Sequence, residues 1–181
     1  TQFYVNAPKC APTRQSVIYG VNYQRIENWT DLGIPADPPG NSEISEHPSH
    51  PGIGEIMGKA GFNTAAFGKW GIDGDAVSTG GFDEFYGHNG PYLKDYFPPY
   101  NNDWRIESDR DYPEPTGYAT YHINDAVVQF IEESVAEGKP FFAYVAQPAP
   151  HNPIMAPDPA DADAPREERY AKMVQAIDDG G

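Results

Sequence analysis

Residues 141–146 read Phe-Phe-Ala-Tyr-Val-Ala, an uninterrupted apolar run bounded on its N-terminal side by Gly138 and Pro140. A run of this kind is typical of a strand that is buried on both faces of a largely parallel sheet. The segment before it, 118–137, predicts a helix that Gly138 and Pro140 end. Its apolar face consists of Ile123, Val127, Phe130 and Ile131. A helix that leads into a buried strand indicates the α/β class.

Further elements are predicted on both sides of this unit. Towards the C-terminus, a helix is expected from about Pro165, with Tyr170, Met173, Val174 and Ile177 on one face. Towards the N-terminus, strands are expected at 62–67 and 3–5, and helices from Pro51 to about Ala60 and from about Pro12 to Ile18. Residues 21–50 predict a loop, and 72–117 show turns and aromatic residues without periodicity. The expected architecture is part of a mostly parallel or mixed sheet flanked by helices.

The composition excludes several classes of function. The chain has 12 Lys and Arg residues and 27 Asp and Glu residues, so its net charge is −15. Such an acidic chain disfavours nucleic acid or an anionic membrane as a partner, because phosphate groups need cationic side chains. One cysteine forms neither an internal disulfide nor a zinc cluster. No apolar run approaches the ~20 residues of a membrane-spanning helix.

The single cysteine, Cys10, has two interpretations. A free cysteine is usually a small buried apolar residue. Here, however, Pro12 predicts a helix that begins next to Cys10, and Arg14 follows one turn later. A helix N-terminus and a guanidinium group together favour anion binding and activate a nucleophile.

The pattern Cys10-x-Pro12-x-Arg14 resembles the signature of the sulfatase family, in which this cysteine is oxidised to formylglycine. Other blocks resemble the family in the same order. They are 3–8 before the cysteine, Ala60 to Trp70 with Gly68-Lys69-Trp70, Gly81 to Gly87, Pro140 to His151 with Ala149-Pro150-His151, and Tyr170 to Asp179. The resemblance implies an alkaline-phosphatase-like fold.

The resemblance also implies that the chain is incomplete at both ends. Family members begin with a strand that carries a metal-binding Asp-Asp pair, which we expect before Thr1. A later Asp-Asn pair and an active-site lysine are expected after Gly181. Residues 1–181 are therefore interpreted as a partial N-terminal catalytic domain that lacks the first strand and the C-terminal part. Relatives are typically exported, so a periplasmic or secreted location is expected.

By resemblance, the active-site residues of this chain are Cys10, Arg14, Lys69 and His151. Cys10, as formylglycine, is expected to supply the nucleophile and to bind a divalent cation, usually Ca²⁺. Arg14 would hold the hydrated aldehyde, Lys69 would bridge it to a sulfate oxygen, and His151 would contact the sulfate or protonate the leaving oxygen. The expected partners are a sulfate ester, such as a sulfated carbohydrate, and a formylglycine-generating or anaerobic sulfatase-maturating enzyme.

Two departures from the family pattern are visible. Gly71 stands where many relatives have His, and Tyr19-Gly20 stands where Thr-Gly is usual. The adjacent acids Asp178-Asp179 are interpreted as the end of the last helix and not as metal ligands. His88 is a weaker candidate for facing the substrate, whereas His47, His50 and His122 are expected at the surface. Asn28-Trp29-Thr30 fits a glycosylation sequon.

Two other functions are consistent with the residues. A phosphomonoester or phosphonate-ester hydrolase of the same superfamily would also use formylglycine, and it would differ in its ratio of activities on phosphate and sulfate esters. A non-catalytic acidic module would bind calcium or a partner through Asp and Glu, and it would keep Cys10 as a thiol.

Overall fold

The computed structural model describes residues 2, 4–22, 51–72, 74–100 and 104–180. Its sheet has four strands, β1 (Asn63–Lys69), β2 (Glu84–His88), β3 (Trp104–Glu107) and β4 (Phe141–Ala146), in the order β3-β2-β1-β4. β1 pairs in parallel with both β2 and β4, and β2 pairs antiparallel with β3. The sheet is thus mixed and mostly parallel, as the sequence predicted.

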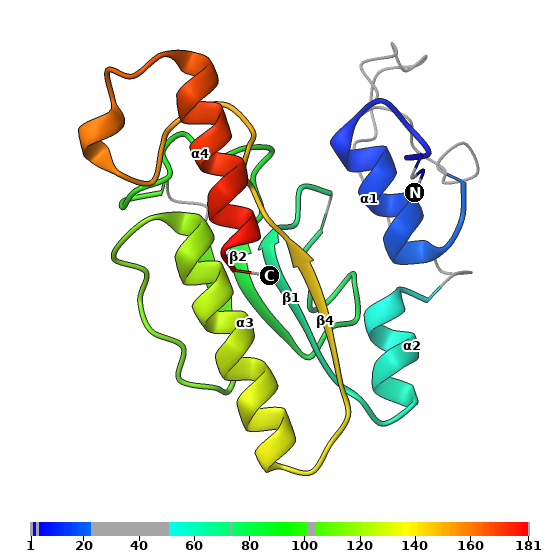
Figure 1. Cartoon of the computed structure of the whole chain (residues 1–181). Coiled ribbons are helices and arrows are strands. Elements are labelled where there is room, and N and C mark those ends of the chain that lie inside the picture. The colour runs from blue at the N-terminus through cyan, green and yellow to red at the C-terminus, as the bar shows by residue number, and fades with distance from the viewer. Residues whose placement is uncertain (1, 3, 23–50, 73, 101–103, 181) are drawn as a thin grey trace.

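Helices cover both sides of this sheet (Figure 1). On one side lie α3 (Ala119–Ala136) and, packed beside it, α4 (Arg166–Asp178). On the other lie α1 (Cys10–Tyr19) and α2 (Ile53–Lys59). The short 3₁₀-helix η3 (Pro159–Asp161) precedes α4. None of the helices in the described part of the chain is long and apolar enough to cross a membrane.

The alternation of side chains along β1 produces two apolar cores. Ala65 and Phe67 are buried with Ile123 and Phe130 of α3. Ala66, on the opposite face, is buried among residues of α1 and of the loop after β1. Because successive residues of a strand point to opposite faces, one short apolar strand holds both helical layers.

Most of the predicted elements are confirmed, with shifted ends. The predicted strand 62–67 extends to Lys69, and the helix predicted from Pro51 begins at Ile53. The last helix buries Met173 and Ala176, whereas Tyr170 and Val174 are each 44% exposed. The predicted apolar face was therefore wrong, because the buried face is rotated about the helix axis by part of a turn. The predicted loop at 21–50 lies, from residue 23 on, outside the described residues.

Two strand predictions were wrong in their details. β4 lies where predicted but is not buried on both faces, since Phe141 is 37% and Val145 is 44% exposed. The reason is its place in the sheet, where β1 is its only neighbour among the described residues. Tyr4 and Val5 are exposed and belong to no strand, because no described strand pairs with them; residue 3 lies outside the described residues.

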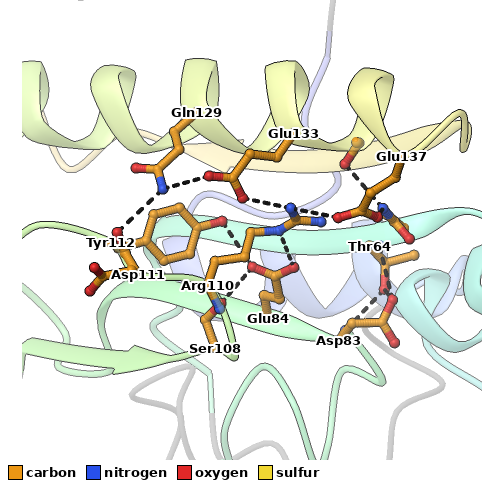
Figure 2. A network of polar contacts seen from close by, with 12 residues as sticks. Thr64, Asp83, Glu84, Ser108, Arg110, Asp111, Tyr112, Gln129, Glu133 and Glu137 are labelled. Carbon is orange, nitrogen blue, oxygen red and sulfur yellow. Dashed lines mark hydrogen bonds and ion pairs between the residues drawn. The ribbon is translucent and has the colours of Figure 1, made fainter.

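β2 and β3 were not predicted. In β2, the first residue is charged, and burial ordinarily excludes a charged residue. Glu84 is only 9% exposed, and Figure 2 shows how Arg110 neutralises it. Arg110 Nε donates to Glu84 Oε1 at 2.7 Å, and its Nη1 donates to Glu133 of α3 at 2.7 Å and to Glu137 at 3.0 Å. Ser108 and Tyr112 also donate to Glu84. This group, the Arg110 network, links the sheet to α3.

Electrostatics within the Arg110 network follow from these contacts. The hydrogen bond from Arg110 lowers the pKa of Glu133, and hydrogen bonds from Asn63 and Arg110 lower the pKa of Glu137. Burial, followed by the nearby Glu84 charge, raises the pKa of Tyr112, so this hydroxyl stays protonated and acts as a donor.

Candidate active site

The candidate site begins at the N-terminus of α1, of which Cys10 is the first residue and is exposed. Lys9 precedes it in an extended conformation, so the chain turns sharply into the helix at Cys10. Pro12 lies in the first turn, where its missing N–H leaves no hydrogen bond unmade. Thr13 Oγ1 donates to Ala7 O at 2.9 Å and ties the preceding loop to the helix. The helix predicted around Pro12 is therefore confirmed, and it begins at Cys10 itself.

Arg14 joins α1 to the sheet. It follows Cys10 by one turn, so the two side chains share a helix face. Its Nη1 donates to the carbonyl oxygen of Lys69 at 2.5 Å and, more weakly, to the hydroxyl of Tyr144 at 3.5 Å. Arg14 thus fixes the start of α1 against the C-terminal end of β1 and against β4.

Lys69 is the last residue of β1, and its side chain reaches Cys10. The residue is only 3% exposed. Burial lowers the pKa of Lys69; the neighbouring Cys10 opposes this shift, and the positive charge of Arg14 adds to it. Its position depends on Gly68, which has a φ of +86° and where a Cβ would lie 2.3 Å from the carbonyl oxygen of Ala146. Only glycine fits there, and it breaks the regular extension of the strand immediately before Lys69.

A cavity of about 520 Å³ opens beside Cys10. Lys9 and Arg14 contribute positive charge to its wall, and the strand β4 contributes apolar surface. Its lining also includes Val5, Ala7, Pro8, Thr13, Val17, Tyr144, Val145 and Ala146. Within a chain of net charge −15, two cations therefore line the cavity at the exposed Cys10, and a third, Lys69, reaches Cys10 from β1, an arrangement suited to an anionic ligand.

His151 lies in the loop after β4 and is held by its backbone. Tyr96 donates its hydroxyl to the carbonyl oxygens of Pro148, at 2.8 Å, and His151, at 3.0 Å. The ring nitrogen Nδ1 lies 2.8 Å from Asn152 O, so we assign its proton to Nδ1 and leave Nε2 as the free acceptor. The ring is parallel to that of Tyr92, with centroids 6.2 Å apart and planes 9° apart.

The structure brings three of the four predicted site residues together. Lys69 contacts both Cys10 and Arg14, whereas His151 lines a separate cavity of about 390 Å³ with Tyr92, Lys94, Asn152 and Pro153. β1 and β4 run parallel, so Lys69 and the loop that carries His151 both leave the same edge of the sheet. Tyr144, Tyr92 and Lys94 were not identified as site residues from the sequence. Tyr144 can be recognised only from the strand order, which sets it beside β1.

The other histidines have different surroundings. His88 ends β2, is fully buried and stands opposite Lys69 in the β1–β2 register, so it does not line either cavity. His122, expected at the surface, is half-buried, and its Nε2 accepts hydrogen bonds from the backbone N–H groups of Thr116 and Gly117. His47, His50 and the sequon at Asn28 lie outside the described residues.

The described residues around Cys10 do not supply a calcium site. Calcium takes six to eight oxygen ligands, yet the charged side chains here are Lys9, Arg14 and Lys69. No group of three or more His, Cys, Asp or Glu residues able to hold a metal occurs in the described ranges. Asp178 ends α4 and Asp179 is its C-cap residue, as predicted.

Comparisons with known proteins identify the family of this arrangement. A model of the sulfatase family matches residues 1–179. The chain is 30% identical over 199 residues to N-acetylgalactosamine-6-sulfatase of Mus musculus and 26% identical over 166 residues to the uncharacterized sulfatase YidJ of Escherichia coli (strain K12). These alignments cover 98% and 85% of this chain, and 37% and 31% of the relatives, so the chain spans about a third of their length.

Solved structures show the same fold. The PsFucS1 sulfatase from Pseudoalteromonas sp. aligns with a TM-score of 0.60 at 20% identity, over 96% of this chain and 43% of that one. The structure of BT4656 in complex with its substrate D-glucosamine-2-N,6-O-disulfate aligns with a TM-score of 0.54 at 23% identity, over 84% of this chain and 27% of that one. With the family match over nearly the whole chain, these findings show that the chain belongs to the sulfatase family.

Proposed function

We propose that this chain is part of the catalytic domain of a sulfuric ester hydrolase that acts through position 10. The observation that carries the proposal is the contact of a buried lysine, Lys69, with an exposed cysteine that begins a helix and shares its face with Arg14. Burial of a cation beside a cysteine destabilises the fold, a cost that is typical of functional sites, and an anionic substrate would give the cation its role. The family supports the same activity.

Position 10 fits the formylglycine that the family implies, because Cys10 is exposed within Cys-x-Pro-x-Arg and faces two cations. As the hydrated aldehyde, this residue supplies the oxygen nucleophile that accepts the sulfuryl group from an ester and later releases it as sulfate. A maturating enzyme would carry out the oxidation of Cys10. Calcium remains part of the proposal, with ligands outside the described residues, and no step below depends on it.

The chain's own residues would then bind and orient the reacting groups. Lys69, already in contact with position 10, would place its positive charge between that residue and a sulfate oxygen, where negative charge develops. Arg14 would hold the N-terminus of α1 against the end of β1 and add positive charge to the site. His151, whose Nδ1 lies 2.8 Å from Asn152 O, would act in its doubly protonated form, in which Nε2–H would donate to a sulfate oxygen or give its proton to the leaving oxygen.

We further propose a sulfated carbohydrate as the substrate class. The ring of Tyr92 is 46% exposed beside His151, and Lys94 lines the same cavity. An aromatic face suits a sugar ring, and a lysine suits an additional acidic group. The name of the similar mammalian enzymes, N-acetylgalactosamine-6-sulfatase, supports a sugar sulfate.

The test uses the full-length protein that contains this chain, coexpressed with a formylglycine-generating enzyme. Mass spectrometry of the tryptic peptide with Cys10 should show conversion to formylglycine, and the protein should hydrolyse 4-nitrophenyl sulfate. Cys10→Ala serves as the inactive control. A preference for 4-nitrophenyl phosphate would favour the phosphoester hydrolase instead. A Cys10 that stays a thiol despite an active maturating enzyme would favour the non-catalytic module and overturn the proposal.

A further inference from the structure

Gly71, two residues after Lys69, lies under the lysine side chain. Its φ is +64°, and a Cβ built there would lie 2.6 Å from Lys69 Cε, 3.2 Å from Cγ and 3.5 Å from Cδ. The first of these distances is far shorter than any non-bonded carbon contact in a packed interior. The aliphatic part of Lys69 therefore occupies the space in which any side chain at position 71 would have to begin.

The backbone on either side of this contact is fixed. The carbonyl oxygen of Lys69 accepts the hydrogen bond from Arg14, and Trp70 N donates to His88 O at 3.0 Å while its side chain is 1% exposed. A Cβ at position 71 would thus displace the part that moves most easily, the end of the lysine side chain. Nζ is bonded to Cε, so a displacement of Cε would shift the ammonium group from its place beside Cys10.

We propose that Gly71 is a positioning residue whose missing side chain lets the Lys69 ammonium group reach position 10. The geometric part of this inference concerns the unmodified chain alone, whereas its consequence for turnover rests on the proposed function.

The test measures the Lys69–Cys10 proximity with o-phthalaldehyde. This dialdehyde condenses with an amine and a thiol that lie close together to form a fluorescent isoindole, with loss of water. The reduced chain carrying Cys10 should give the fluorescence, and mass spectrometry should find the Cys10 peptide linked to the Lys69 peptide. Peptide analysis separates this product from one formed with the adjacent Lys9. Lys69→Gln should abolish the linkage.

Gly71→Ala should lower the yield of the Lys69–Cys10 product about 10-fold or more, since such condensations depend steeply on the placement of both groups. Gly138→Ala is the matched control, because Gly138 has nearly the same φ, +69°, and open space where the Cβ would stand. Both variants introduce the same backbone strain, and only one introduces the contact with Lys69. The control should retain the wild-type yield.

A second variant separates displacement from misfolding. Gly71→Asn adds the same Cβ, but asparagine tolerates a positive φ, so it should keep the wild-type near-ultraviolet circular dichroism while losing the product. Wild-type yields in both position-71 variants would overturn the inference. In the matured full-length protein, Gly71→Ala should lower kcat in the wild-type background and add no further loss in Lys69→Ala. Absence of sulfatase activity in all variants would contradict the proposed function only, since the isoindole assay does not depend on it.

Discussion

Replacing the buried lysine of the site by methionine is expected to stabilise the fold while removing activity. Lys69 is 3% exposed, and burial is the main cause of its lowered pKa. Each unit of pKa shift corresponds to about 1.4 kcal/mol, and exchange of buried charges for apolar residues of similar volume often stabilises a protein by about 1–4 kcal/mol. Lys69→Met keeps most of the buried carbon atoms and loses the contact with Cys10. We therefore expect a net gain in unfolding free energy of about 1 kcal/mol at pH 7.

The pH dependence of this gain has a definite sign. A lysine with a lowered pKa in the folded state destabilises the fold at every pH below that value, because folding then requires burial of the charge. The penalty disappears as the pH rises from the lowered value in the folded state towards about 10.4, the pKa in the unfolded chain. The difference between Lys69→Met and the wild type should therefore be largest at pH 7 and smaller above pH ~10.

Urea unfolding followed by tryptophan fluorescence measures this difference, since Trp70 lies next to the substitution and is buried. Lys59→Met is the matched control, because Lys59 is exposed and pairs with Glu55 on the surface of α2; it should change stability by less than about 0.5 kcal/mol. A Lys69→Met variant that is less stable than the wild type at pH 7 would refute the reasoning. It would mean that Lys69 is held in place for the sake of the fold.

Further predictions concern the contacts between the sheet and α3, and the nucleophile position, Cys10. Arg110→Met should lower the unfolding free energy by about 3–5 kcal/mol, because it leaves Glu84 buried without its cation. In urea titrations, the double variant with Glu84→Gln should recover part of this loss. If the losses from the two substitutions simply add, Arg110 does not compensate Glu84. Phe130→Ala, at a fully buried position on α3 where the ring packs against Phe67 of β1, should lower the unfolding free energy by about 3–5 kcal/mol in thermal unfolding. The pKa of Glu133 is lowered in the fold, so acidification through pH ~4.3 and below should remove the small stabilisation that this carboxylate contributes. Glu133→Gln should therefore flatten this part of the dependence of the unfolding free energy on pH. In the matured full-length protein, Cys10→Ala should lower kcat by about 10⁴-fold or more with unchanged circular dichroism.

The sequence predicted what depends on local patterns. The run at 141–146 and the periodicity of 118–137 gave β4 and α3 within a residue or two of their ends, because a strand followed or preceded by glycine and proline is specified locally. β2 was missed because its charged first residue, Glu84, is compensated by Arg110 from 26 positions further along the chain. Partners so distant in sequence leave no local pattern.

For the candidate site, the sequence indicated candidate residues, whose roles stay predictions, but it did not indicate their arrangement. The contact between Lys69 and Cys10 joins positions 59 residues apart and depends on a left-handed glycine in a strand, which no periodicity indicates. The separate cavity at His151, with Tyr92 against the ring, likewise follows from a loop conformation. Short motifs identify reactive side chains, whereas their distances depend on long-range packing.

The exposed position of β4 has a consequence for the behaviour of this chain in solution. With β1 as its only neighbour among the described residues, β4 offers backbone donors and acceptors along one side, and Phe141 and Val145 add apolar surface. Such an edge is a template for association between copies. The net charge of −15 opposes that association by mutual repulsion, which salt screens within about 10 Å at 0.1 M. The colloidal stability of the chain should therefore fall as ionic strength rises, and the acidity of its surface acts as protection for this edge of the described sheet.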